Sequence, residues 1–262
     1  MTRTLLVLLA CVVCLAHARA DDDGLPAAAR LAFQEGRYAE ARHQAEAQAT
    51  APALAFAARA VIADAITRPD GFCMDCLKQA QALARKAAAL DPGVVEAHLQ
   101  EAVALGFLGR AMGIAAARRE GLAEKVRATL DRALALDPGN PWAEASLGAW
   151  HLEIVTHAGP LLASILYGAD ETEGLALYRR GLGKIGDEPM LRYQFALALL
   201  ARGTTPLENE AGIILQQIAT STQSDALARF VRSRSARLLD VMAAGQADER
   251  ARLVRALQGY GP

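Results

Sequence analysis

The turn Leu-Asp-Pro-Gly occurs twice in this chain, at 90–93 and at 136–139, each time directly after an alanine-rich stretch. Proline and glycine end a helix, and the residues after each turn resume the apolar spacing of a second helix. The two prolines, Pro92 and Pro138, lie 46 residues apart. A recurring helix–turn–helix unit predicts stacked helix pairs, because one such unit cannot bury its apolar side alone.

The two copies also share a pattern of small and apolar side chains. When the turns are superposed, one helix face is matched in both copies, with Ala80, Ala84 and Ala87 against Val126, Leu130 and Ala133. After the second turn, Pro141 suits the first turn of a helix, where its missing N–H is not needed. Gly148, in the middle of that helix, predicts a place where a neighbouring helix comes close.

Helical spacing continues through most of the chain, and no segment alternates as a half-buried strand does. The sequence therefore predicts an all-α fold. We expect helices near 25–35, 38–50, 52–67, 75–90, 94–108, 121–136, 141–156, 172–184, 189–202, 206–219, 224–244 and 247–258.

These units resemble the tetratricopeptide repeat, a helix pair of about 34 residues. The segment "AARLAFQEGRYAEARHQAEA" has Ala29, Gly36, Tyr38 and Ala41 at the matching places, and "EPMLRYQFALALLARG" is similar to the first helix of a later unit. The resemblance implies a tetratricopeptide-like α-solenoid of stacked antiparallel helix pairs. The helix at 224–244 has one apolar and one arginine-rich face, and we expect it to be the C-terminal capping helix.

The spacing of 46 residues exceeds one tetratricopeptide unit by about 12. The extra residues lie in "RAMGIAAARREG", and a second insertion is "THAGPLLASILYGADETEG". Interrupted repeats with "LGAWHLEIV", "LYG" and "LALYRRGL" resemble bacterial relatives of regulator-of-microtubule-dynamics proteins. They resemble more loosely the T component of tripartite ATP-independent periplasmic transporters. The resemblance covers roughly residues 75–200 and implies a membrane-associated transporter as one alternative partner.

The second insertion contains a short apolar stripe, formed by Leu161, Leu162, Ile165 and Leu166. Exposed apolar patches of this kind are uncommon on soluble monomers. We therefore expect the stripe to fill a gap between helices, with docking of a partner as the alternative.

Residues 1–20 have the pattern of a signal peptide, with Arg3, an apolar run, and Ala-Arg-Ala at 18–20. A lipoprotein anchored at Cys11 is the alternative. The mature domain is then 21–262, in the periplasm or secreted, and it contains no second apolar run of spanning length. Removal of the signal peptide changes the formal charge from −1 to −3, because residues 1–20 hold two arginines and no acid. Without a basic run, nucleic acid is excluded as a partner.

Cys73 and Cys76 lie at the start of a predicted helix. In an exported domain this spacing predicts a structural disulfide, and a redox-active pair is the alternative, since a helix N-terminus lowers a thiol pKa. Residue 77 is leucine, so the c-type haem attachment pattern is absent, and the neighbourhood offers no further zinc ligands.

No constellation for catalysis or metal binding stands out. Among His151, Glu153 and His157, only the last two share a helix face, and two side chains are too few for a metal site. No nucleophile elbow, phosphate-binding glycine loop or paired-carboxylate motif occurs. We expect no enzyme and no cofactor.

The first helices of stacked pairs line a concave face on which peptides commonly lie. In the register above, this face carries Glu96, Leu99, Val103, Trp142, Glu153, Met190, Tyr193 and Leu197, with Trp142 and Tyr193 as the aromatic anchors. The leading hypothesis is an exported, non-enzymatic scaffold that binds a protein or peptide in this groove. The alternatives are a transporter-associated carrier of a small molecule, with a pocket closed by the insertions, and a thiol oxidoreductase.

Overall fold

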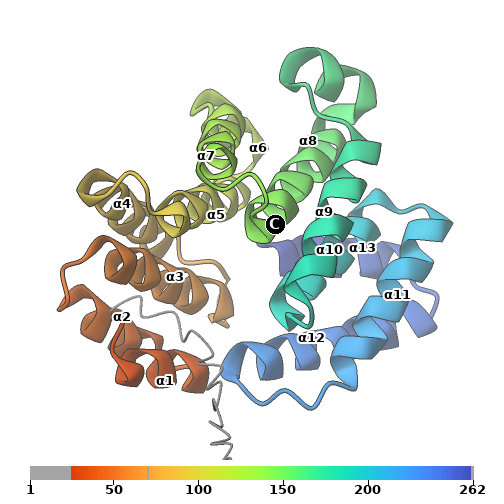
Figure 1. The fold of residues 1–262 in the computed structure, drawn as a ribbon. Helices are drawn as coiled ribbons and strands as arrows, with labels where there is room; N and C mark the ends of the chain where they lie inside the picture. Colours follow the sequence, from red (N-terminus) through yellow and green to blue (C-terminus); the bar gives the residue numbers. More distant parts are fainter. Residues whose placement is uncertain (1–24, 70, 261–262) are drawn as a thin grey trace, which may run out of the picture.

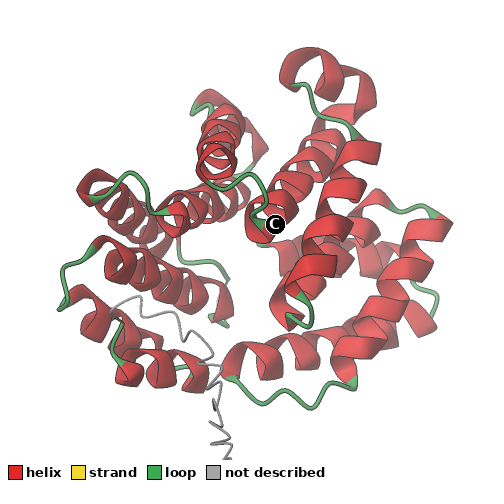
Figure 2. Cartoon of the chain, in the orientation of Figure 1, coloured by secondary structure: helices red, strands yellow, loops and turns green. Residues whose placement is uncertain are grey.

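A computed structural model describes residues 25–69 and 71–260. The predicted signal peptide and Cys11 lie outside the described residues. Within them the fold is all-α, without strands (Figures 1 and 2). The helices are α1 (Ala27–Glu35), α2 (Tyr38–Glu46), α3 (Ala51–Thr67), α4 (Met74–Leu90), α5 (Val95–Met112), α6 (Ile114–Arg119), α7 (Leu122–Leu136), α8 (Pro141–Tyr167), α9 (Glu171–Ile185), α10 (Pro189–Arg202), α11 (Thr205–Ala219), α12 (Ala226–Ala243) and α13 (Ala247–Gln258).

The two Leu-Asp-Pro-Gly turns separate helices as predicted. In the first, the Asp91 carboxylate accepts a hydrogen bond from the backbone N–H of Gly93 at 2.9 Å. After the second, the side-chain oxygen of Asn140 accepts from the N–H groups of Trp142 and Ala143, and Pro141 occupies the first turn of α8. These bonds satisfy donors that a helix start leaves unpaired. The matched alanines Ala80, Ala84, Ala87 and Ala133 are fully buried, which confirms the predicted face.

The closest helix pair is α8 with α9, which meet at Gly148. A Cβ atom on Gly148 would lie 2.6 Å from the backbone nitrogen of Tyr178 and 2.7 Å from the carbonyl oxygen of Gly174. Both distances are shorter than any normal contact, so the two backbones touch here because residue 148 has no side chain. The expectation that a helix comes close at Gly148 is confirmed.

The helices pack largely in sequence order and curve round until α12 meets α1 (Figure 1). Helix α1 contacts α12, and a Cβ atom on Gly36 would come within 2.8 Å of the Ala226 Cβ atom. The arrangement is therefore a closed ring. Helix α12 is in contact with α1, α10, α11 and α13, so it does not end the stack with a free face.

Both predicted insertions are helical. The first forms the short helix α6, which the sequence reading missed. The second extends α8 past a break at Gly159, whose φ of 75° and ψ of 157° lie outside the helical range, so that Pro160 starts a new direction. The segment Pro160–Tyr167 is called the α8 tip below.

The core is unevenly divided. Its largest cluster lies among α8 to α13 and is built from large side chains, with Tyr178, Tyr193, Phe195, Leu199 and Leu215 almost fully buried. Between α1 and α5 the clusters are smaller. Three of them are dominated by alanine, and those around Ile62 and Leu77 contain larger aliphatic side chains. Over the described part of the chain, no single helix has both the length and the hydropathy to cross a membrane. Helices α8 and α9 meet these criteria only as a pair that bends by 94°.

Candidate functional site

The residues predicted to line one groove do not form one exposed surface. Leu99, Tyr193 and Leu197 are 4%, 1% and 0% exposed. Val103, Trp142 and Met190 are partly buried and pack against the apolar clusters. Glu96 accepts a hydrogen bond from the side chain of Gln100 on its own helix. The prediction of an open groove with Tyr193 and Leu197 as contact residues is therefore wrong for this folded form.

The physical reason is the position of α10. Helices α8, α9, α11, α12 and α13 all contact it, so no long face of α10 is left for a partner. Met190, at its start, reaches the cluster of Val61, Ile62 and Ile66 on α3. The inside of the ring is thus filled by the protein's own side chains.

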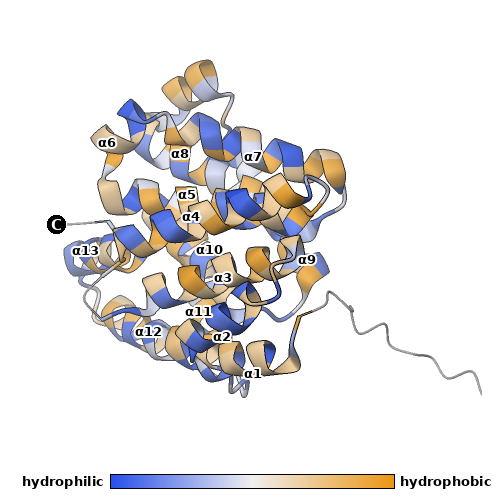
Figure 3. Cartoon of the chain, turned by 90° about the vertical axis from the view of Figure 1, so that its left-hand side faces the viewer, coloured by the Kyte–Doolittle hydropathy of each residue, from blue (hydrophilic) through white to orange (hydrophobic). Residues whose placement is uncertain are grey.

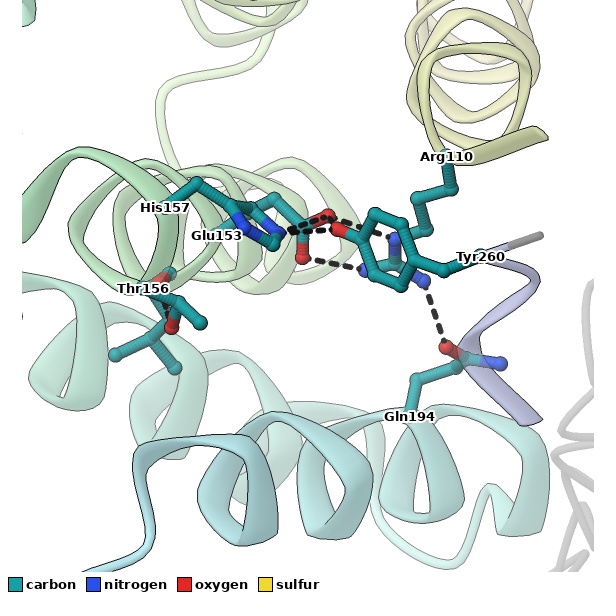
Figure 4. A network of polar contacts seen from close by, with 7 residues as sticks. Arg110, Glu153, Thr156, His157, Gln194 and Tyr260 are labelled. Carbon is teal, nitrogen blue, oxygen red and sulfur yellow. Dashed lines mark hydrogen bonds and ion pairs between the residues drawn. The ribbon is translucent and has the colours of Figure 1, made fainter. Parts of the chain in front are cut away.

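Glu153 lies at the centre of a polar network inside the ring (Figure 4). Its two carboxylate oxygens accept hydrogen bonds from the Arg110 guanidinium, both at 3.0 Å. Tyr260 follows α13, and its hydroxyl also donates to Glu153 and lies 2.6 Å from Nε2 of His157. Arg110 additionally donates to the Gln194 side chain at 3.3 Å. The network joins α5, α8, α10 and the end of the chain.

The electrostatics of this network fix its charges. Burial alone would raise the pKa of Glu153, but the Arg110 charge and the donated hydrogen bonds hold that pKa well below its ordinary range. Burial and the Glu153 charge raise the pKa of Tyr260 far above its ordinary value. Glu153 therefore stays ionised and Tyr260 stays protonated at neutral pH. Since both carboxylate oxygens of Glu153 already accept hydrogen bonds, the network holds together the helices that supply them.

The prediction that Glu153 and His157 share a helix face is confirmed, since Nε2 of His157 lies 3.8 Å from Oε1 of Glu153. Among the residues described, no group of three or more His, Cys, Asp or Glu side chains is placed to hold a metal ion. His151 is buried, and its Nδ1 accepts a hydrogen bond from the Asp170 N–H at 3.0 Å.

Cys73 and Cys76 form a disulfide at the start of α4, as predicted. The sulfur of Cys73 accepts a hydrogen bond from the Cys76 N–H at 3.2 Å, in the N-cap position. The neighbouring Phe72 ring packs edge-on against Phe107 at 5.3 Å and directly on Gly259. A side chain at 259 would overlap that ring, and the φ of 88° there also favours glycine. The disulfide loop thus contacts the segment that carries Tyr260.

An open cleft remains where the two ends of the ring meet, and we call it the closure cleft. One wall comes from α1 and α3. The other comes from Glu188, which precedes α10, and from residues 223–229, which lead into the first turn of α12. The lining residues are Arg30, Leu31, Phe33, Gln34, Glu35, Phe56, Arg59, Glu188, Gln223, Ser224, Asp225, Leu227 and Arg229. Sequence reasoning missed this site, because its walls are more than a hundred residues apart in the chain.

Most charged groups in the closure cleft are engaged within the protein. Glu35 pairs with Arg37 at 2.5 Å, the Asp225 carboxylate caps α12 by accepting from the Ala228 N–H at 3.0 Å, and Arg229 donates to the Ser224 carbonyl. The exception is Arg59, which makes no hydrogen bond or ion pair with any residue in 25–69 or 71–260. Its guanidinium carbon lies 5.2 Å from the centre of the Phe33 ring.

Apolar surface adjoins this guanidinium. Phe33 packs against Phe56 with ring centres 5.5 Å apart, and Leu31 is 51% exposed. On the opposite wall, burial raises the pKa of Glu188, and the Arg59 charge opposes that rise. The closure cleft therefore places the Arg59 guanidinium, without an acceptor among the described residues, beside an aromatic and aliphatic surface.

A comparison with models of protein families gives no match for this chain, and a comparison with curated proteins gives none either.

Proposed function

We propose that this chain is an exported, non-enzymatic helical-repeat protein that binds an acidic, extended segment of a protein partner in the closure cleft. The observation that carries the proposal is the unpaired Arg59 guanidinium over Phe33, next to the half-exposed Leu31. A carboxylate of the partner would pair with Arg59, and a neighbouring apolar side chain would cover Leu31 and Phe56. Sites of this kind combine an apolar wall with a few orienting polar groups.

The tetratricopeptide-like solenoid belongs to the same proposal. Helix pairs that pack in sequence order support it, as do the buried alanines of the two matched units. In this view α13, not α12 alone, completes the cap, because α13 packs on both α10 and α12. Export through the signal peptide at 1–20 is the accompanying proposal, with a periplasmic or secreted mature protein.

The test uses a random peptide library displayed on phage and panned against the mature protein. We expect enrichment of peptides in which an acidic residue stands close to a large apolar one. Arg59→Ala should weaken the enriched peptides by about ten- to hundredfold, because a hydrogen bond to a charged group contributes about 1.5–3 kcal/mol. The matched control is Arg132→Ala, which removes an exposed arginine on α7.

Peptides that bind the wild type and the Arg59→Ala protein equally well would contradict the proposed site. Failure to enrich any acidic peptide would contradict the proposed partner chemistry. Leu31→Asp is a second variant, since it places a negative charge where the apolar contact is expected, without changing any buried group.

A thiol oxidoreductase is the second candidate, and the position of Cys73 at the N-cap of α4 favours it, because a helix N-terminus stabilises a thiolate. Catalysed reduction of insulin that disappears in Cys76→Ser would support this function. We propose the structural role instead, since the loop packs Phe72 against Gly259 and Phe107. The small-molecule carrier would require an enclosed apolar cavity, whereas the closure cleft and the cleft at Ile114 are both open to solvent.

A further inference from the structure

The α8 tip has an unusual surface for a helix that faces solvent. Leu161, Leu162, Ile165 and Leu166 are 71%, 51%, 68% and 56% exposed. The expectation that this stripe fills a gap between helices is therefore wrong. Only Ala163 and Tyr167, on the other side of the tip, pack against the cluster formed by α5, α7, α8 and α9. A surface helix normally turns polar side chains outward, so the aliphatic outer face needs an explanation.

The tip also stands away from the body. Gly159 breaks the helix, and the turns that follow form the uppermost part of the molecule in Figures 1 and 3, where they are largely orange in the hydropathy colouring. From Ala158 to Ala169 the sequence contains no charged side chain. The apolar residues are thus concentrated on a projection, not on the wall of a groove.

Helix α6 lies in the same upper part of the molecule in both views and carries two arginines in its last turn, Arg118 and Arg119. Ile114 is 47% exposed and lines a shallow cleft with Ala115, Arg118 and Arg119. Both arginines are exposed, and neither forms an ion pair or hydrogen bond with another described residue. An apolar projection with cations at the same end of the molecule matches the two features of an anionic lipid surface.

The area of the patch argues against a second copy of the chain as the occupant. The four tip side chains together expose on the order of 500 Å², near the upper end for a monomer's largest apolar patch. A stable protein interface needs about 800 Å² from each partner and a complementary surface. A membrane interface needs neither, because a few aliphatic side chains that enter the acyl boundary, helped by headgroup attraction, give reversible binding.

We propose that the α8 tip and α6 form a docking site for an anionic membrane surface, with the tip's aliphatic side chains inserted and Arg118 and Arg119 on the headgroups. The closure cleft lies near α1 and α12, at the opposite end in both views. A docked molecule would therefore present that cleft away from the membrane. The inference does not depend on what the cleft binds.

The experiment measures co-flotation of the mature protein with two kinds of vesicle. One contains equal parts of phosphatidylglycerol and phosphatidylcholine, and the other contains phosphatidylcholine alone. We expect the protein to bind the anionic vesicles and this binding to fall as the salt concentration rises. Binding to the neutral vesicles should be at least about tenfold weaker. Absence of binding to the anionic vesicles overturns the proposal.

Two variants separate the contributions. Leu162→Ser with Ile165→Ser should reduce binding to anionic vesicles at least about tenfold, because the inserted surface is lost. Arg118→Gln with Arg119→Gln should weaken binding several-fold and flatten its salt dependence. The matched control is Ile213→Ser, which removes a 63% exposed isoleucine from α11 and should bind as the wild type does.

Tip variants that bind like the wild type overturn the proposal. Light scattering of the free protein tests the other occupant. A dimer that becomes monomeric in the tip variant would assign the patch to a second copy of the chain and would also overturn the membrane site. All these residues are exposed, so circular dichroism should show unchanged helicity.

Discussion

Arg110 in the ring interior and Arg59 in the closure cleft show how the same side chain serves two purposes. Arg110 is largely covered and donates to Glu153 and Gln194, on two other helices. Arg59 lies over Phe33 and has no acceptor among the described residues. An arginine whose donors are all used by the fold stabilises that fold, whereas one whose donors are free has capacity left for a ligand. This difference supports a structural role for the Arg110 interior and the proposed binding role for the closure cleft.

Arg110→Ala should destabilise the fold more than any other substitution considered below. Removing one partner of a largely covered pair leaves the Glu153 charge poorly compensated, and we expect a loss of about 3 kcal/mol in the free energy of unfolding. Urea denaturation at pH 7 measures it. Arg85→Ala is the matched control, because Arg85 pairs with Glu101 at 2.7 Å but is 58% exposed, and such pairs contribute about 0–1 kcal/mol. Equal losses in the two variants would contradict a special role for the interior.

The disulfide comes next in size. Replacing both Cys73 and Cys76 with alanine should cost about 2 kcal/mol, the chain-entropy value for so short a loop. Because Phe72 packs on Gly259, hydrogen exchange near Tyr260 should become faster, while the enriched peptides should still bind the cleft. Loss of peptide binding in a folded double variant would mean that the two regions are not independent.

The smallest effect concerns Glu188, where burial raises the pKa above the ordinary 4.5. A carboxyl whose pKa is higher in the folded state lowers stability as pH rises through the interval between the unfolded and folded values. Glu188→Gln should therefore raise Tm at pH 7 by about 1–2 °C and leave it unchanged well below pH 4.5. Glu153 has the opposite sign: its depressed pKa gives stability above the ordinary value that is lost as pH falls below it. A lower Tm for Glu188→Gln at pH 7 would contradict this assignment.

The features that local chemistry controls were predictable from the sequence. Proline and glycine mark the two turns, Asn140 and Asp225 cap helices, and Gly148 marks a close approach. These depend on residues a few positions apart, or on one small side chain facing a neighbour. Helix α6 is absent from the expected helices, although "IAAARR" consists of residues that tolerate a helix well.

The closing of the ring was not predictable in the same way. Tyr260 reaches Glu153 across more than a hundred residues, and nothing in either local sequence indicates it. Repeat register predicts that Tyr193 and Leu197 share a helix face with the other groove residues. It does not predict which helices cover that face. The prediction that the α8 tip is buried is wrong for a different reason. Apolar spacing indicates burial, but the break at Gly159 turns the apolar face outward.

We propose that ligands enter the closure cleft and leave the ring interior closed. Hydrogen–deuterium exchange of the mature protein, with and without a saturating enriched peptide, tests it most directly. We predict slower exchange in α1, in α3 around Arg59 and in residues 220–229, with no change around Arg110, Glu153 and Tyr260. Slower exchange at the interior network, or faster exchange at Tyr260 together with an unchanged cleft, would contradict the account.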